Sequence, residues 1–280
     1  MSKEILELFL VTDIHHGAPF GTKRSDQAQL LLDNFITSAN NYKPDLVIDL
    51  GDRINDIDHL TDLRLLRDVA EQFKMLQCQR EHLVGNHDIH FLSIEENENL
   101  LESVLQSRSS DLNGWHLVFW CPNAKYSPSS GFVDDQASLK WLQKNLREND
   151  KPTIIFCHVP QFVGDLSGNF WFGNNPWAAS LPYAQNVLKI IEKDPNVKMT
   201  IGGHVHWPRL ATLHGVHHIT LPSIIESFFS NGEPCGAWTK IAIDKQIHLT
   251  INGTESHHWS LPIRHGDMIW PDPRPSNKIK

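Results

Sequence analysis

Five short segments of the 280-residue chain carry side chains that could hold metal ions or move protons. They are residues 12–17 (TDIHHG), 51–53 (GDR), 85–88 (GNHD), 157–160 (CHVP) and 202–206 (GGHVH). Histidine is frequent in the whole chain, with 17 residues against 3 tyrosines. Because histidine is the commonest metal ligand and the usual proton carrier near neutral pH, these segments point to metal-assisted or acid–base chemistry.

The spacing within two of the segments suggests that each grips one ion. Asp13 and His15 lie two residues apart, as do His204 and His206. A two-residue step on extended backbone would turn both side chains of a pair to the same face. Three further candidate ligands are Asp52, Asn86 and His158. Carboxylate, amide and imidazole ligands without thiolate suit Mn, Fe, Zn or Ni, and seven ligands for two ions leave positions open for water and substrate.

The elements that must position these residues are short apolar runs, which predict buried strands. The predicted strands are 6–12, 46–50, 82–84, 117–120, 153–157 and 198–201. Each of the five polar segments directly follows one of these strands. Ligands of open α/β sheets lie outside the carboxyl ends of the strands, so pairing in one sheet or in two facing sheets would bring all five loops to one cleft.

Helical patterns separate the early strands, whereas strands run together after residue 207. The predicted helices cover 28–42 and 61–79, one that Asp134 or Asp135 caps, and one that opens at Ser180–Pro182 and ends at Asp194. The later predicted strands are 210–213, 217–221, 238–243 and 247–251. Alternating strands and helices followed by consecutive strands predict a layered α/β fold with one antiparallel region.

Composition excludes several classes of protein. Hydrophobic residues make up 40% and charged residues 21%, which is a globular balance and excludes a disordered chain. The net charge of −8 argues against nucleic acid or an anionic membrane as a partner. No apolar stretch reaches membrane-spanning length, no signal peptide is recognisable, and the four cysteines form no CxxC pair. We therefore expect a cytoplasmic protein without a membrane span, and the sequence leaves a homo-oligomer open.

The order D-x-H, GD, GNHD, H and GHxH between residues 6 and 221 resembles the calcineurin-like metallophosphoesterase superfamily, in its small-molecule phosphodiesterase branch of cyclic-nucleotide and glycerophosphodiesterase type. The resemblance implies a four-layer αββα sandwich, in which two facing mixed β-sheets are flanked by helices and two metal ions sit at their edge. It implies one ion on Asp13, His15, Asp52 and His206, and a second on Asp52, Asn86, His158 and His204. Asp52 would bridge the ions.

The same resemblance implies catalytic roles for two residues of the GNHD motif. His87 would not bind metal. It would protonate the leaving oxygen or stabilise the charged phosphorus centre, and Asp88 would hold it in place. Two adjacent metal ions suit this chemistry, because they clamp the attacking and leaving oxygens of an in-line displacement and lower the pKa of a bound water.

Other residues are candidates for substrate contact. His16 and Arg53 follow candidate ligands directly. Phosphoprotein phosphatases continue their GD motif with a fixed Asp-Arg-Gly, whereas residues 51–56 read Gly-Asp-Arg-Ile-Asn-Asp, which argues against a protein phosphatase. Phe162, Trp171 and Trp177 belong to an aromatic segment that either packs against the domain or walls the organic part of the substrate. Segments within 91–130 and 160–180 are therefore candidate lids or caps.

These observations predict a catalytic domain over residues 1–251 and a C-terminal extension over 252–280. The expected function is a dinuclear-metal phosphodiesterase, with two Mn, Fe or Zn ions, that attacks a small organic phosphodiester through a metal-held hydroxide. The candidate substrates are a cyclic nucleotide, a glycerophosphodiester and a nucleotide-linked diester. The alternatives are a phosphomonoesterase acting on a small metabolite and a non-catalytic binding module on the same fold.

Overall fold

Two six-stranded sheets face each other in the computed structural model, which describes residues 5–264, 271 and 274. The first sheet contains, in spatial order, β14 (His257–Pro262), β13 (Gln246–Asn252), β12 (Trp238–Ile243), β1 (Leu6–Val11), β2 (Leu46–Asp49) and β3 (Arg80–His82). The second contains β10 (Arg209–Leu213), β11 (Val216–Thr220), β9 (Val197–Gly202), β8 (Thr153–Phe156), β5 (Trp115–Phe119) and β4 (Arg108–Leu112). A small ribbon pairs β6 (Tyr126–Ser127) with β7 (Gly131–Phe132).

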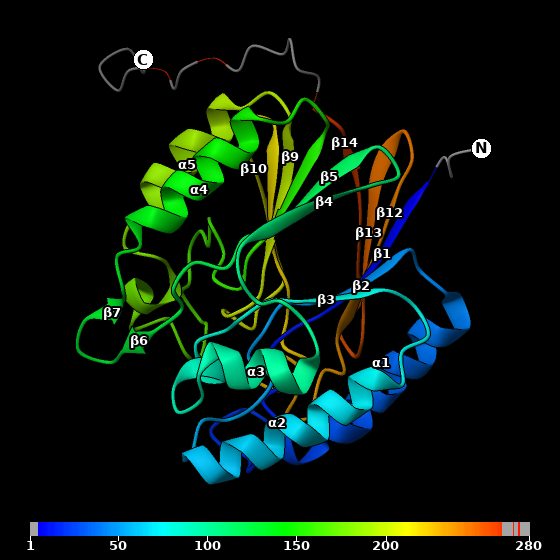
Figure 1. The fold of residues 1–280 in the computed structure, drawn as a ribbon, viewed down its shortest axis with the longest axis vertical. Coiled ribbons are helices and arrows are strands. Elements are labelled where there is room, and N and C mark those ends of the chain that lie inside the picture. Colours follow the sequence, from blue (N-terminus) through cyan, green and yellow to red (C-terminus); the bar gives the residue numbers. More distant parts are fainter. Residues whose placement is uncertain (1–4, 265–270, 272–273, 275–280) are drawn as a thin grey trace.

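Helices cover the outer face of each sheet. They are α1 (Ala28–Tyr42), α2 (His59–Lys74), α3 (Ile94–Leu101), α4 (Gln136–Arg147) and α5 (Ala184–Lys193), with short 3₁₀ turns η1 (Ser25–Gln27), η2 (His87–Ile89) and η3 (Pro176–Ala179). The first three helices pack on the first sheet, and α4 and α5 pack on the second (Figure 1). The predicted four-layer αββα sandwich is confirmed.

The central strands β1, β2, β5 and β8 are apolar on both faces because both of their faces are buried, whereas β12, β13 and β14 alternate between buried and more exposed residues. In β1, Leu8 and Leu10 point into the core between the sheets, whereas Phe9 and Val11 point toward the helices. The alternation follows from the two-residue period of a strand. It explains why the sequence shows continuous apolar runs here.

Most predicted helices and strands are present, and the differences fall where the sequence pattern of an element is short or polar. Asp135 caps α4, since its carboxylate accepts a hydrogen bond from the Ser138 amide at 2.9 Å. The helix predicted over 61–79 is shorter and covers His59–Lys74. Helix α3 and strand β4 were not predicted, because α3 has eight residues and β4 is a polar edge strand without an apolar run.

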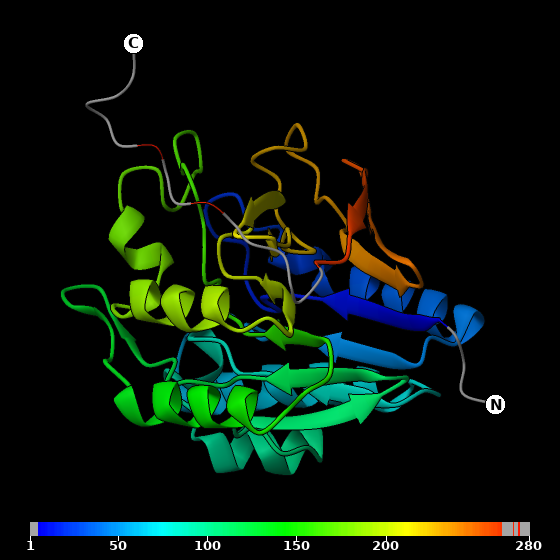
Figure 2. The ribbon, with the colours of Figure 1, turned by 90° about the horizontal axis from the view of Figure 1, so that it is seen from above.

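Parallel pairing brings the polar loops to one edge of the sandwich. Strands β1, β2 and β3 are parallel to one another, and β5, β8, β9 and β11 form a parallel set in the second sheet. Figure 2 shows the chain turned by 90°, with β1 and β2 side by side. The carboxyl ends of β1, β2, β3, β8 and β9 therefore deliver the five segments that the sequence singles out.

The first sheet continues beyond the domain boundary expected at residue 251. Strand β14 pairs antiparallel with β13 and lies in the segment expected to be a C-terminal extension. The rest of that segment is largely outside the described residues. Among the residues that the structure describes, no helix has the length and apolarity needed to cross a membrane.

Candidate metal centre and active site

Sharp turns after the strands place five of the candidate ligands in the left-handed region of backbone space. The φ angles are 53° at Asp13, 45° at His15, 55° at Asp52, 63° at His204 and 55° at His206. The expectation of extended backbone within the two pairs is therefore wrong. Asp13 and His15 do belong to one group of candidate ligands, but His204 and His206 belong to different groups, so the expectation that this pair grips one ion is also wrong. Left-handed backbone costs a residue with a side chain of the order of 1–3 kcal/mol, and such positions cluster at functional sites.

Two glycines leave room for the carboxylates of the site. A Cβ atom on Gly85 would lie 2.0 Å from Asp52 Oδ1, and one on Gly203 would lie 2.4 Å from Asp13 Oδ2. Real Cβ atoms do not approach other atoms so closely. The glycines of the GNHD and GGHVH segments are therefore required because the backbone passes directly against the two aspartates.

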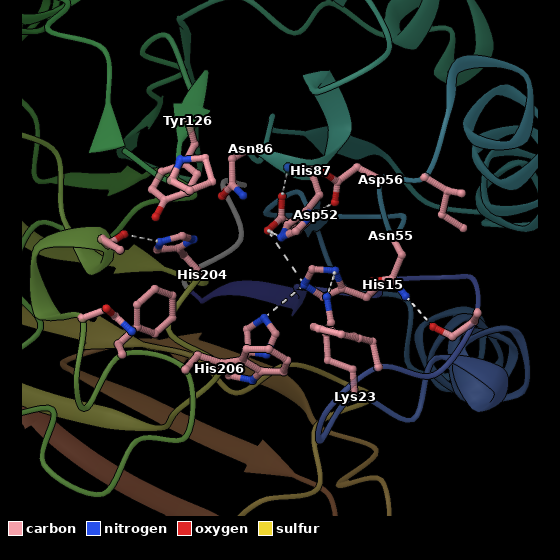
Figure 3. Close-up of a pocket in the computed structure, with 18 of the residues that line it drawn as sticks. His15, Lys23, Asp52, Asn55, Asp56, Asn86, His87, Tyr126, His204 and His206 are labelled. Atoms are coloured by element: carbon pink, nitrogen blue, oxygen red, sulfur yellow. Dashed lines mark hydrogen bonds and ion pairs between the residues drawn. The ribbon is translucent and has the colours of Figure 1, made fainter. Parts of the chain in front are cut away.

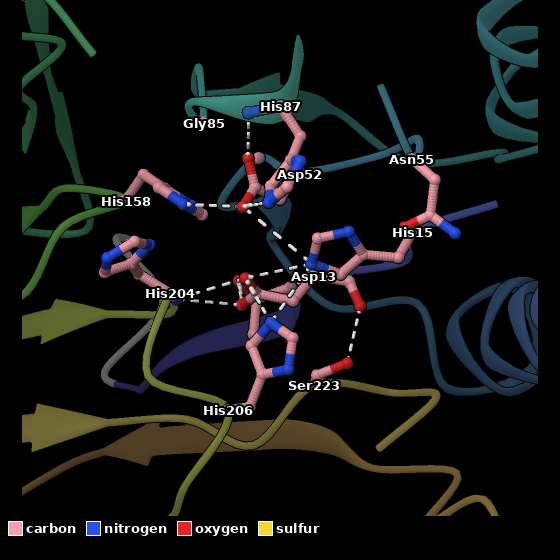
Figure 4. Close-up of polar contacts among 12 residues, drawn as sticks. Asp13, His15, Asp52, Asn55, Gly85, His87, His158, His204, His206 and Ser223 are labelled. Atoms are coloured by element: carbon pink, nitrogen blue, oxygen red, sulfur yellow. Dashed lines mark hydrogen bonds and ion pairs between the residues drawn. The ribbon is translucent and has the colours of Figure 1, made fainter. Parts of the chain in front are cut away.

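One group of candidate ligands consists of Asp13, His15 and His206, whose ligand atoms all lie within 4.8 Å of one another. The Nε2 atoms of His15 and His206 are 3.0 Å apart, and His206 Nε2 lies 3.3 Å from Asp13 Oδ1 (Figure 4). All three side chains are buried. The Asp13 carboxylate also accepts hydrogen bonds from the His204 amide at 3.0 and 3.1 Å, which ties the two sheets together.

A second group consists of Asp52, His158 and His204. His158 Nε2 lies 3.1 Å from Asp52 Oδ2, and the same oxygen lies 3.8 Å from His15 Nε2. Asp52 thus stands between the two groups. Asn86 lines the cavity beside them, and its buried Oδ1 atom has no hydrogen-bond partner among the described residues.

The remaining ring nitrogens of three histidines face fixed acceptors. His158 Nδ1 lies 3.1 Å from the Leu50 carbonyl, His204 Nε2 lies 3.0 Å from the Ala178 carbonyl, and His206 Nδ1 lies 2.8 Å from Glu226 Oε2. Metal-binding histidines usually donate their second nitrogen in this way, which fixes the ring and its tautomer. Together with the orphaned oxygen of Asn86, this arrangement fits a site for metal ions.

The charges of the cluster perturb its histidines strongly. Burial alone would lower the pKa of His206, but the Asp13 and Glu226 carboxylates raise it to about 9. Burial would likewise lower the pKa of His158, but the Asp52 carboxylate raises it to about 9. Burial and the charge of His158 lower the pKa of His204 to about 4. Metal ions and protons therefore compete for the same nitrogens, since a ligating imidazole nitrogen must be deprotonated.

His87 differs from the buried histidines. Its side chain is 29% exposed, it lines the cavity, and its Nε2 atom is 4.0 Å from Asp52 Oδ2. Its Nδ1 atom contacts the Asp56 carboxylate. The expectation that Asp88 holds His87 is wrong, and Asp56 takes that place.

Asp88 instead organises the backbone of the site. Its buried carboxylate accepts hydrogen bonds from the amides of Asp52 at 2.9 Å, Arg53 at 2.8 Å and Gly85 at 2.8 Å. The Arg53 guanidinium donates a further hydrogen bond to it at 2.8 Å. Asp88 therefore fixes the loop that carries Asp52 and does not reach the cavity.

Three of the predicted substrate contacts lie elsewhere. Arg53 is fully buried, with Nε 2.6 Å from Asp49 Oδ2, so its charge is already paired. His16 lies 3.5 Å from Asp68 on a neighbouring surface depression. The Phe162 ring packs on His218 at 6.0 Å and does not line the cavity. These three predictions are wrong because the side chains turn away from the cleft that their neighbours line.

A cavity of about 680 Å³ opens over the cluster (Figure 3). Trp171 and Trp177, the other two predicted substrate contacts, line it together with Phe20, Tyr126 and Phe172. Both segments expected to act as lids contribute, since Tyr126 belongs to residues 91–130 and the tryptophans to 160–180.

Three charged residues of the site were not found from the sequence. Lys23 lines the cavity with Nζ 3.4 Å from His15 Nδ1, and burial lowers its pKa. Asp56 contacts His87, and Glu226 contacts His206. Glu226 carried a usable signal, because it is the one charged residue in the apolar run 221–229 (LPSIIESFF). Lys23 and Asp56 lie in loops and carried none.

The fold and the double cluster at the strand ends define a class of metal-dependent hydrolases. The family model described as calcineurin-like phosphoesterase matches residues 6–208. The chain therefore belongs to the calcineurin-like phosphoesterase family, as its motifs suggested, and is a metal-dependent phosphoric ester hydrolase.

The following individual relatives are each less than 25% identical to this chain. A 3′,5′-cyclic-nucleotide phosphodiesterase from Nostoc sp. is 24% identical over 196 residues, which cover 67% of this chain and 69% of that protein. A dimetal phosphatase from Danio rerio superposes with a TM-score of 0.75 at 16% identity, covering 93% of this chain and all of the other. GAP50, the anchor in the inner membrane complex of Plasmodium, superposes at 0.60 with 12% identity, covering 94% and 90%. These structural likenesses show the shared fold.

Proposed function

We propose that this protein is a dinuclear-metal phosphodiesterase acting on a small organic phosphodiester. One metal ion would be held by Asp13, His15, Asp52 and His206. The other would be held by Asp52, Asn86, His158 and His204. The observation that carries the proposal is that two groups of candidate ligands, Asp13–His15–His206 and Asp52–His158–His204, adjoin below a cavity of about 680 Å³, with Asp52 Oδ2 3.8 Å from His15 Nε2.

The metal ions, when bound, would supply Lewis acidity toward the phosphoryl oxygens and lower the pKa of water. We propose that the ions are Mn, Fe or Zn. Oxygen and imidazole donors without thiolate suit these ions. The buried carboxylates of Asp13 and Asp52 provide the negative charge that neutralises two neighbouring cations.

His87 is proposed to donate a proton to the departing oxygen. Contact with Asp56 orients the imidazole through Nδ1, so that Nε2 is the atom left toward the cavity and the reacting phosphoryl group. A proton at Nε2 can pass to an alkoxide as its bond to phosphorus breaks. His87 also lies within reach of His15 and Asp52 as a possible third group of ligands. Its exposure of 29%, against 1% for His15 and 2% for His158, favours the role of proton donor over metal ligation.

The charge of the cavity favours a diester. Lys23 is the one lysine or arginine lining it among the described residues, since Arg53 is paired with Asp49 and Asp88. A diester carries one negative charge at neutral pH, whereas a monoester carries up to two. The named activity of the Nostoc relative points in the same direction.

Turnover of two synthetic esters tests the proposal. The metal-loaded protein is expected to cleave bis-p-nitrophenyl phosphate with a higher kcat/KM than p-nitrophenyl phosphate. Much faster cleavage of the monoester would contradict it and favour the alternative, a phosphomonoesterase. That alternative has one observation in its favour, because the Lys23 ammonium could neutralise a second phosphoryl charge.

Glu226→Gln is expected to weaken metal binding without unfolding the protein. Glu226 Oε2 accepts hydrogen bonds from His206 Nδ1 and from Trp171 Nε1, each at 2.8 Å. Glutamine keeps the shape but loses the charge that makes the imidazole a strong ligand. Loss of such a partner lowers metal affinity by about 10- to 100-fold. Calorimetric titration with Mn²⁺ measures the change, and an unaltered affinity would show that Glu226 does not act through His206.

A further inference from the structure

Resting on the proposed function, we infer that the substrate carries a flat aromatic ring, such as a nucleobase, which stacks on the pair Tyr126 and Trp177. The cavity then has a ring subsite beside its metal centre. The substrate class narrows from small diesters in general to diesters with a ring-bearing arm, such as nucleotide diesters.

The geometry of the two rings supports stacking. The Tyr126 and Trp177 ring planes are within 15° of parallel, with centroids 6.3 Å apart, and both side chains line the cavity. Trp177 is 50% exposed, which is unusual for so large an apolar side chain. Tyr126 is half-buried. Two nearly parallel rings, one of them exposed, offer a flat apolar surface to a planar group.

Both rings are connected to the candidate ligand His204 through a neighbouring residue that contacts it. Phe132 packs edge-on against Tyr126 with centroids 5.2 Å apart and against the His204 ring at 5.3 Å. Trp177 is adjacent in sequence to Ala178, whose carbonyl lies 3.0 Å from His204 Nε2. Figure 3 shows Tyr126 and His204 on one side of the site, away from Asp56 and Asn55. The ring subsite therefore sits next to the centre that would hold the phosphoryl group.

Trp171, the other tryptophan of the cavity, is already committed to internal contacts. Its indole Nε1 donates to Glu226, Lys23 Nζ lies 5.4 Å from its ring centroid, and Phe20 and Phe170 pack on it at 5.9 and 4.9 Å. Trp177 has no comparable set of contacts among the described residues. Of the two tryptophans, Trp177 thus has the freer ring, and it lies on the His204 side. The exposed ring of Phe20 lies beside Trp171.

A polar group beside the rings could read the edge of a base. Asn175 lines the same cavity, and its carboxamide makes no hydrogen bond within the described part of the chain. A carboxamide offers both a donor and an acceptor, which matches the edge of a nucleobase. An alkyl arm such as glycerol has no flat face to stack on the rings and no base edge to hydrogen-bond with Asn175.

Trp177→Ala separates ring-bearing from ring-free diesters. For 3′,5′-cyclic AMP the variant is expected to raise KM by about 5- to 150-fold, the range that loss of one stacking side chain produces, with kcat changed less than about threefold. For glycerophosphoethanolamine, which has no ring, KM should stay within about twofold. Trp177→Phe should restore most of the affinity for cyclic AMP. Phe91→Ala is the control, because Phe91 is an exposed aromatic residue that does not line the cavity.

Equal KM changes for both esters, or no change for either, would overturn the ring subsite while leaving the proposed function intact. If the wild type cleaves no diester, the proposed function fails and binding decides the inference. Calorimetric titration of metal-loaded protein with AMP should then show affinity about 5- to 150-fold weaker in Trp177→Ala. Equal affinities would overturn the inference.

Discussion

His87→Ala is expected to lower kcat by about 10²- to 10⁴-fold while the metal content stays unchanged. His87 lies at the cavity, contacts Asp56 through Nδ1 and belongs to neither proposed ligand set. Its removal should therefore affect proton transfer and not metal binding. Steady-state kinetics on an alkyl phosphodiester, with elemental analysis of the same sample, measures both effects.

The leaving group distinguishes the two roles that His87 could have. p-Nitrophenolate departs without needing a proton, whereas an alkoxide needs one. A proton donor predicts a large defect on an alkyl diester and a small one on bis-p-nitrophenyl phosphate. A defect of equal size on both esters would instead favour electrostatic stabilisation of the phosphorus centre.

Asp56 provides a second check on the same assignment. Asp56→Asn should give a smaller defect than His87→Ala, and adding it to His87→Ala should cost little more, because the two residues act as a unit. His90→Ala is the matched control. His90 also faces Asp56, at 3.7 Å, but it is more exposed than His87 and does not line the cavity. Activity in that variant should be unchanged.

Asp52→Asn is expected to remove metal binding and lower activity by at least about 10³-fold. Oδ2 of Asp52 lies 3.1 Å from His158 Nε2 and 3.8 Å from His15 Nε2, so its charge serves both ligand groups. Asparagine keeps the shape but cannot neutralise two cations. Metal ions contribute several kcal/mol to such reactions, and each 1.36 kcal/mol corresponds to a tenfold change in rate.

Metal content and thermal stability check this prediction together. Mn²⁺ should raise the Tm of the wild type by binding the folded state and should leave the Tm of Asp52→Asn almost unchanged. Asp62→Asn is the matched control, since Asp62 on α2 is an equally buried carboxylate that belongs to none of the candidate ligand groups and accepts a hydrogen bond from the Ile57 amide. Full metal content and activity in Asp52→Asn would rule out the shared ligand.

The fold was predictable because its signals are local. A strand buried on both faces is an apolar run such as residues 6–11, and a helix such as α1 shows its apolar face at regular spacing. Elements whose signal is weak were missed: β4 is polar, and β14 lies in a polar, tryptophan-containing tail. Both segments are strands because they pair with a neighbouring strand, although their composition does not favour strand structure.

The sequence by itself indicated which five loops carry the candidate ligand types, and that these loops would meet if their strands paired in one sheet or in two facing sheets. Only the tertiary structure decided which side chains meet. Asp56, 31 residues before His87 in the chain, contacts it where the adjacent Asp88 does not, and Glu226 reaches His206 from another loop. Arg53, beside a candidate ligand in sequence, points into the protein and pairs with Asp49. The physical reason is that spacing along a strand sets the face a residue occupies, whereas side-chain partners at a sheet edge depend on loop turns and on the second sheet.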